Sequence, residues 1–346
     1  MTVLYYNNLD IRTRNTKLRA VSSLVEAQMP IDRVCGFNKY DIKFEPLPTK
    51  EISLNLSFKD CCLKRAMDLW NLDKPISVLW SGGIDSTVAF IALWITAPNK
   101  KDLTVRCSTS AINEFPDLFR DMIDPIAIVV SDKDVLNKKY LDDKNIIKVN
   151  GDCGDQLFGS IALSNNNEYR YRPWKDIFVQ SNKILYPRYN YSDDFFNEKL
   201  LPELKELLPQ FVEKSPVEIT NIFDLYWWIN FAVDWMTYDI RIVTIYSQSL
   251  EKDTNISFFN APFFQQWAIT NFNNNYYDLV SCGKNVAKKF INDVYKNENY
   301  FLNKQKVKSM RNIINTEDKI RNDAILLALV DGHFWVNTDQ LPREYI

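Results

Sequence analysis

The segment Ser81-Gly82-Gly83-Ile84-Asp85-Ser86 combines residue types that bind phosphate and a metal ion. It lies between the apolar runs 76–80 and 87–94, which predict a strand before it and a helix after it. Backbone N–H groups at the start of such a helix point into one concavity, and the helix dipole adds positive potential there. The two glycines let the backbone approach phosphate oxygens closely. The serines offer hydroxyl groups, and the aspartate offers a carboxylate to magnesium.

This loop differs from the phosphate loop of kinases and GTPases, because no Gly-Lys-Ser or Gly-Lys-Thr follows the glycines. A glycine turn between a strand and a helix can also exist without any ligand. Five positions with suitable residues in a strand–loop–helix context favour a nucleotide site over a turn that binds nothing.

A second loop, Gly151-Asp152-Cys153-Gly154-Asp155, repeats this order. The predicted strand 146–150 ends in a glycine, the loop carries two acids, and a helix is expected to start near Asp155. Two acidic loops that follow strands of one sheet are expected to serve the same ligand.

The region from Pro75 to Ser160 alternates between strand and helix patterns. The predicted strands are 76–80, 103–107, 126–130 and 146–150. This alternation predicts an α/β fold with a doubly wound parallel sheet that binds ligands at the carboxyl ends of its strands. Cys107, the last residue of the second strand, is therefore placed among the nucleotide-contacting residues.

The rest of the chain is divided into flanking regions. Residues 1–72 are expected to form a small α+β appendage, 73–165 the nucleotide-binding core, and 166–346 a helical substrate region. The appendage is expected to hold a hairpin of 33–37 and 40–44, with its turn at Asn38-Lys39, and a helix from Ser57 to Leu69. After Ser160 no strands are expected, and helices are predicted at 192–212, 216–250, 262–271, 285–296 and 316–333. The aromatic residues Trp227, Trp228, Phe231 and Trp235 have the spacing of a buried helix face.

Composition narrows the class of protein. The chain has 346 residues, 46% of them hydrophobic, and a formal net charge of −2. This charge gives no reason to expect nucleic-acid binding. The six cysteines lack the spacing of a metal site, and His333 is the single histidine, which argues against zinc. No segment has the pattern of a leader or a membrane span, so reduced thiols in the cytoplasm are expected.

Together the two loops resemble the synthetase domain of asparagine synthetases, which are ATP pyrophosphatases. That family carries Ser-Gly-Gly-x-Asp-Ser and, further on, Ser-Gly-Glu-Gly-x-Asp-Glu-Leu-Phe-Gly-Gly. The resemblance implies a fold like that of the adenine nucleotide alpha hydrolases, with ATP and magnesium as cofactors. It implies that Asp85 and Asp155 hold magnesium on the pyrophosphate moiety. Asp152 falls on the glutamate beside the substrate and is one methylene shorter, and Cys153 takes the place of a glycine.

The resemblance extends more faintly over roughly residues 50 to 310. Lys284 opens a segment similar to the family's Lys-x-x-Leu-Arg-x-x-Phe helix, which implies a nucleotide contact. Lys304-Gln305-Lys306 is similar to an Arg-Gln-Lys run, in which the last lysine contacts phosphate. Lys306 is thus expected to neutralise charge during adenylation and amide formation. The sequence departs from the family at Asn260 and Gln265, where arginine and aspartate are usual.

The resemblance implies an ATP-dependent ligase that adenylates a small-molecule or peptide carboxylate, releases pyrophosphate, and transfers the acyl group to ammonia or an amine. A glutaminase domain of about 200 residues does not fit before Ser81. Ammonia is therefore expected to arrive free, or from a separate partner protein. Two alternatives stay open: a non-catalytic, regulatory ATP-binding protein, and an enzyme that adenylates a nucleobase or a tRNA group.

Overall fold

The computed structural model describes residues 31–33, 37–38, 45–48, 55–132, 134–158, 171–176, 201–232, 235, 254–272, 284–304, 328–330 and 333–335. The chain forms two compact units. One comprises Met1–Ile42, Gly159–Trp235 and Glu317–Ile346, and the other comprises Lys43–Phe158 and Met236–Thr316. Both predicted loops belong to the second unit.

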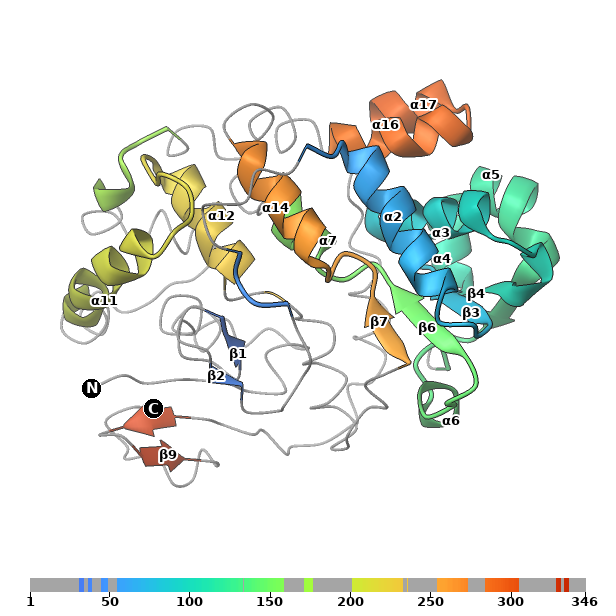
Figure 1. Cartoon of the computed structure of the whole chain (residues 1–346), viewed down its shortest axis with the longest axis horizontal. Coiled ribbons are helices and arrows are strands. Elements are labelled where there is room, and N and C mark those ends of the chain that lie inside the picture. The colour runs from blue at the N-terminus through green and yellow to red at the C-terminus, as the bar shows by residue number, and fades with distance from the viewer. Residues whose placement is uncertain are drawn as a thin grey trace. The chain divides into compact units, whose positions relative to one another are not determined.

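A five-stranded parallel sheet forms the centre of the second unit (Figure 1). Its strands are β3 (Ile76–Leu79), β4 (Leu103–Ser108), β5 (Ala127–Val130), β6 (Ile147–Asn150) and β7 (Asn255–Ser257). The order is β5-β4-β3-β6-β7, and each neighbouring pair is parallel. Starting from β3, the chain thus adds β4 and β5 on one side, then returns and adds β6 and β7 on the other side. The predicted α/β fold with a parallel sheet is confirmed, and each of the four predicted strands is placed within one residue.

The central strands are buried on both faces, which explains their nearly continuous apolar sequence. Every residue of β3 and β6 is buried, whereas the edge strand β5 leaves Ile128 and Val129 exposed. Lys148, the one charged residue of β6, is also fully buried. Its ammonium donates hydrogen bonds to the carbonyls of Leu141 and Asp143 and to the Thr254 hydroxyl, so its charge is solvated by the protein.

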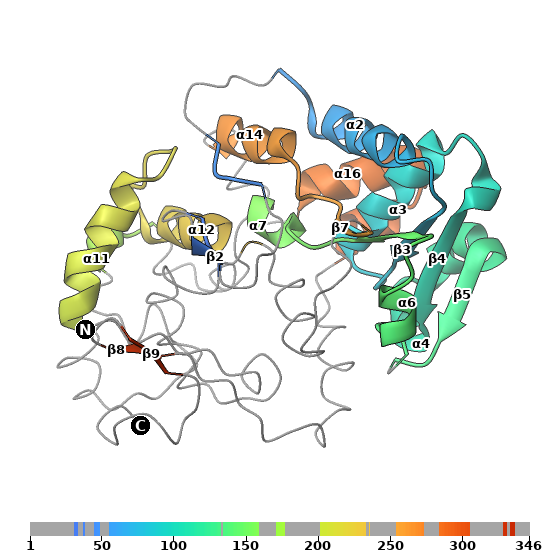
Figure 2. The same cartoon turned by 60° about the horizontal axis from the view of Figure 1, so that its bottom comes forward.

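Three helices lie together beside this sheet (Figure 2). Helix α3 (Ile84–Thr96) packs on β3, β4 and β6, while α2 (Phe58–Trp70) and α16 (Asn285–Val294) pack on α3. Helix α2 begins with a capping box between Ser57 and Asp60, as the predicted cap at Ser57 requires. Its Cys61 and Cys62 are fully buried and belong to the core.

An aromatic cluster around Phe58 joins α2 to the C-terminal helices of this unit. The Phe58 ring centroid lies 5.1 to 6.4 Å from the centroids of Phe158, Phe259, Phe264, Trp267 and Phe290. These rings come from α2, α7 (Gly154–Phe158), α14 (Pro262–Thr270), α16 and the turn after β7. Since α7 continues the second predicted loop, this packing fixes the end of that loop.

The described part of the first unit contains helices α11 (Leu201–Glu213) and α12 (Ile222–Ala232) and short strands. The four aromatic residues predicted to form a core face, Trp227, Trp228, Phe231 and Trp235, are completely buried. The Arg33 guanidinium lies 4.3 Å from the Trp235 ring centroid and donates a hydrogen bond to the Phe231 carbonyl. None of the helices that the structure describes is both long enough and apolar enough to cross a membrane.

The prediction that no strand follows Ser160 is wrong. Strand β7 completes the sheet. Strand β8 (Ala328–Val330) lies inside the predicted helix 316–333, and it pairs with β9 (His333–Trp335). The sequence between β8 and β9 is Asp-Gly, a strong signal for a two-residue hairpin that helical periodicity obscured.

The N-terminal hairpin also differs from its prediction. Its described strands are β1 (Ile31–Asp32) and β2 (Phe37–Asn38), so Asn38 belongs to a strand and not to the turn. The predicted second strand, 40–44, lies outside the described residues.

Candidate functional site

The two predicted loops lie side by side at one edge of the sheet. They follow β3 and β6, which are parallel neighbours with Val78 opposite Val149. Strands that are parallel end at the same edge, so both loops leave the sheet in the same direction. The strand order reverses between β3 and β6, the position where open parallel sheets bind ligands.

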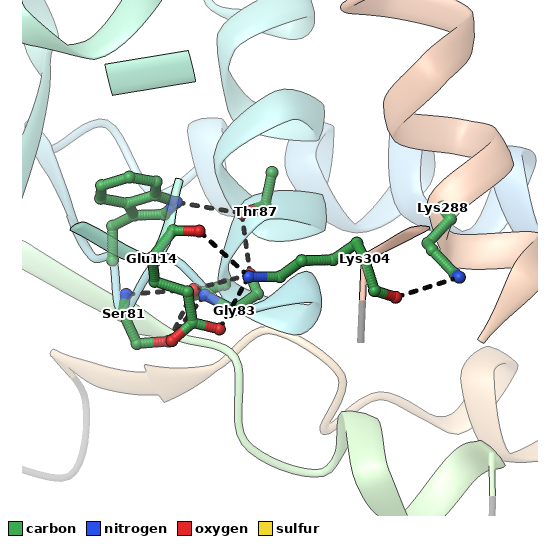
Figure 3. Close-up of polar contacts among 8 residues, drawn as sticks. Ser81, Gly83, Thr87, Glu114, Lys288 and Lys304 are labelled. Carbon is green, nitrogen blue, oxygen red and sulfur yellow. Dashed lines mark hydrogen bonds and ion pairs between the residues drawn. The ribbon is translucent and has the colours of Figure 1, made fainter. Parts of the chain in front are cut away.

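The first loop is held in shape by its own side chains. The Ser86 hydroxyl accepts a hydrogen bond from the Ser81 N–H at 3.1 Å and donates one to the Gly83 carbonyl at 3.2 Å. The two serine hydroxyls are also hydrogen-bonded to each other at 3.0 Å. Thr87 donates to the same carbonyl at 2.8 Å and accepts from the Trp80 indole N–H (Figure 3). In this structure the two serines, predicted to contact phosphate, thus organise the loop itself.

No side chain caps the start of helix α3. Gly83 is its N-cap and has no side chain to accept hydrogen bonds from the first-turn N–H groups. A helix begun in this way directs backbone donors and the positive end of its dipole toward the space above the loop.

Glycines allow the loop to pack closely on its surroundings. Gly82 has a φ of +75°, and a Cβ atom there would lie 2.4 Å from the Ala111 carbonyl oxygen and 2.7 Å from Glu114 Cβ. At Gly154, a Cβ atom would lie 2.6 Å from Asp85 Cγ, and one at Gly151 would lie 2.6 Å from a backbone nitrogen of the first loop. The two loops are therefore in direct contact, and both need glycine at these points.

The second loop has a tight backbone. The Asp152 N–H donates to the Asn150 side-chain oxygen at 2.8 Å, and Cys153 adopts a φ of +67°. A left-handed φ favours glycine, which agrees with the expectation that Cys153 occupies a glycine position. Cys153 and Cys107 are both fully buried, and burial raises the pKa of the Cys107 thiol to about 11. Cys107 at the end of β4 is thus a protonated core residue at neutral pH.

A lysine joins the two predicted metal-binding aspartates. Lys284 Nζ lies 2.5 Å from an Asp85 carboxylate oxygen and 2.6 Å from Asp155 Oδ1. The Lys284 side chain is only 5% exposed, whereas Asp85 is 19% and Asp155 is 37% exposed. Burial by itself lowers the pKa of Lys284, but the attraction and hydrogen bonds of Asp155 and Asp85 outweigh burial and raise it. Lys284 therefore carries its positive charge at neutral pH.

The backbone of Lys284 is also unusual. Its φ is +65° and its ψ is +50°, and it forms the N-cap of α16. A lysine in the left-handed region is uncommon and gains nothing locally from its side chain. Such conformations gather at functional sites, where the surrounding structure holds them in place.

A second buried ion pair lies against the first loop, where Glu114 packs next to Gly82. Lys304 follows α17 (Glu298–Asn303), and its ammonium lies 2.9 Å from Glu114 Oε1 and 3.2 Å from the Glu114 carbonyl oxygen (Figure 3). The Glu114 and Lys304 side chains are 3% and 8% exposed. The Tyr300 ring of α17 stacks on Phe115 with centroids 4.0 Å apart. This end of α17 is thus fixed to the residues on which Gly82 packs.

The structure brings most of the predicted site residues together. One continuous group unites the first loop, the second loop and Lys284, and it contains Ser81, Gly82, Gly83, Asp85, Ser86, Gly151, Asp152, Asp155 and Lys284. Lys306 lies outside the described residues. Glu114 was not predicted, because a single glutamate far from both loops in sequence carries no local signal.

The donor set suits magnesium held jointly with phosphate. Among the described residues, no three His, Cys, Asp or Glu side chains gather as a metal site. Magnesium bound with nucleotides commonly uses only one or two carboxylates, together with phosphate oxygens and water. Asp85 and Asp155 meet that requirement, because oxygens of both carboxylates converge on one small cationic group, the Lys284 ammonium.

Comparisons with protein-family models, with curated proteins and with solved structures found no match. The family resemblance thus rests on the two loops and the downstream lysines. The chemistry of the site rests on the contacts described above.

Proposed function

We propose that the second unit is an ATP-dependent ligase similar to the synthetase domain of asparagine synthetases. It would adenylate a carboxylate, release pyrophosphate, and pass the acyl group to ammonia or an amine. The observation that carries this proposal is the meeting of the two Gly–Asp loops around Lys284. Two acids and a cation converge there next to the start of a helix.

The strand order supports a doubly wound sheet of the adenine nucleotide alpha hydrolase type. Strands β4 and β5 extend to one side of β3, and β6 and β7 extend to the other. ATP would bind at the carboxyl ends of β3 and β6, in the crevice that this reversal creates.

The first loop would bind the phosphates through its backbone. No side chain caps the first turn of α3, and the N–H groups at a helix N-terminus are suited to bind the oxygens of a polyphosphate. Gly83 keeps the N-cap position of α3 free of a Cβ atom. Gly82 instead lets the loop pack on Ala111 and Glu114. The hydrogen bonds between Ser81 and Ser86 keep the loop in this shape before the ligand arrives, which lowers the entropic cost of binding.

Negative charge on the departing pyrophosphate must be stabilised. In the first step a carboxylate oxygen attacks the α-phosphorus, and the bond to the bridging oxygen breaks. Asp85 and Asp155 would hold magnesium, which supplies electrostatic stabilisation of the pyrophosphate charge. Lys284 would donate to a phosphate oxygen from the same side.

The second step joins the amine to the acyl group. The amine nitrogen attacks the acyl carbon, AMP departs, and the nitrogen loses a proton. By resemblance, Asp152 would lie beside the acyl substrate and Lys306 would stabilise the developing oxyanion. Asp152 belongs to the same loop as Asp155, so the acyl group would lie next to the phosphates.

An exchange assay tests the proposal. Purified protein is mixed with ATP, magnesium, labelled pyrophosphate and one carboxylate at a time, including amino acids, dicarboxylic acids and short peptides. We expect label to enter ATP with at least one carboxylate. Asp85→Asn should lose the exchange while its circular dichroism stays unchanged. Asp68→Asn is the matched control, because Asp68 lies exposed on α2 and pairs only with Lys64 in the ion pairs described.

Two results would count against the proposal. If Asp85→Asn exchanged as fast as the wild type, the site would be misassigned. If ATP bound to this site but no carboxylate supported exchange, a regulatory ATP-binding protein would be the better account.

A further inference from the structure

Lys284 lies where a divalent cation would have to bind. Its ammonium contacts the carboxylates of both Asp85 and Asp155 within 2.6 Å, so those two oxygens are no more than twice that distance apart. One small cation between two hard carboxylate oxygens is also the arrangement that magnesium or manganese needs. An ammonium and a divalent ion cannot occupy that position together.

We propose that Lys284 occupies the cation position between Asp85 and Asp155 until a phosphate-bearing ligand draws it away, so that this site takes up its divalent metal only together with phosphate. This inference rests on the proposed function, because it assigns a role to a residue of the same site. It goes further in assigning an order to metal and phosphate binding.

The burial of Lys284 makes the exchange depend on phosphate. With a side chain that is 5% exposed, the ammonium cannot lose its anionic partners without a large desolvation cost. A free divalent ion offers Lys284 no new anion and adds positive charge beside it. A polyphosphate offers oxygens that can replace the carboxylates, and it brings negative charge for the metal. Only a polyphosphate supplies anionic partners for both the lysine and the metal.

The lysine side chain can make this exchange without a change in the backbone. Lysine has a flexible four-carbon stem and a point charge with three rotatable donors, so its ammonium can turn from one oxygen to another. The Lys284 backbone is fixed as the left-handed N-cap of α16, which packs on α3. The carboxylate of Asp85 lies in the first turn of α3, within the loop proposed to bind phosphate.

Manganese is a suitable probe, because its binding can be measured without turnover. We would use equilibrium dialysis with pyrophosphate present or absent in both chambers, and count the excess of Mn²⁺ on the protein side. The wild type should bind about one equivalent with pyrophosphate and at least tenfold more weakly without it. Lys284→Met should bind Mn²⁺ without pyrophosphate at least tenfold more tightly than the wild type does, and Mn²⁺ should raise its melting temperature.

Two further variants serve as controls. Lys284→Arg keeps the positive charge and should behave like the wild type, with no gain in binding by Mn²⁺ alone. Lys284→Met combined with Asp155→Asn removes one carboxylate and should lose the gain that Lys284→Met shows. This pair distinguishes a site between the two aspartates from metal that binds elsewhere.

The proposal is overturned if folded Lys284→Met binds Mn²⁺ no better than the wild type. It is also overturned if the wild type binds Mn²⁺ alone as tightly as with pyrophosphate, and Asp155→Asn abolishes that binding. The second comparison uses the wild type and Asp155→Asn, and therefore holds even where Lys284→Met does not fold. Failure of the proposed function alone looks different: pyrophosphate still brings Mn²⁺ onto the wild type, but no carboxylate supports exchange.

Discussion

The buried pair Glu114–Lys304 should contribute strongly to stability, and Glu114→Gln measures that contribution. The two side chains are 3% and 8% exposed, and Nζ and Oε1 lie 2.9 Å apart. Removing one charge of a buried pair costs about 3–5 kcal/mol, because the other charge stays buried without its partner. Lys304 keeps its hydrogen bond to the Glu114 carbonyl in this variant. We therefore expect the free energy of unfolding to fall by an amount near the lower end of that range, about 3 kcal/mol.

Urea unfolding of the wild type and variants provides the assay. The double variant Glu114→Gln/Lys304→Met removes both charges and should recover much of the loss, since no charge is then left unpaired. Lys64→Gln is the surface control. Lys64 pairs with Asp68 at 3.1 Å, but both side chains are more than 40% exposed, so its loss should stay below about 1 kcal/mol.

The reasoning would be refuted if Glu114→Gln lost no more stability than Lys64→Gln. It would also be refuted if the double variant were as unstable as both single changes added together. Either result would mean that the two charges are solvated independently and do not fix the end of α17 to the residues on which Gly82 packs.

Four further results are expected. Gly82→Ala should cost at least about 2 kcal/mol, because its left-handed φ costs roughly 1–2 kcal/mol and its Cβ collides with the Ala111 carbonyl oxygen. Gly83→Ala should be tolerated, because its φ is −76° and the nearest atom to its Cβ, Ser81 Oγ, is 3.2 Å away; equal melting temperatures for the two variants would contradict this. Lys306→Ala should slow amide formation about 100-fold or more while ATP affinity changes little, as steady-state kinetics and a separate binding titration can measure. A loss that comes mainly from weaker ATP binding would contradict this role. Amide formation from ammonium should accelerate as pH rises toward the pKa of the amine, and a rate that is flat with pH at limiting ammonium would contradict attack by the free amine.

Local sequence patterns were sufficient to predict the parts that lie close together in the chain. The strand before Ser81, the glycines after it and the apolar helix that follows form one continuous signal, and the second loop repeats it. The cap at Ser57 was equally local, since its partner Asp60 is three residues away. In each case one physical rule acts within a few residues.

The contacts that complete the site join distant segments and leave no local pattern. Lys304 meets Glu114 across 190 residues, and Lys284 meets Asp85 across 199. The resemblance implied a nucleotide contact for Lys284, but it did not imply an ion pair with both aspartates. Strand β7 was missed for a similar reason, because its three residues become a strand only beside β6.

The products of ATP consumption test the central claim most directly. The loop before α3 lacks the Gly-Lys-Ser/Thr of enzymes that transfer the terminal phosphate. We would incubate the protein with ATP, magnesium, ammonium and the carboxylate that supports exchange, and quantify nucleotides by chromatography. The account predicts AMP and pyrophosphate in equal amounts, with both absent from Asp85→Asn. ADP and phosphate as the main products would contradict it.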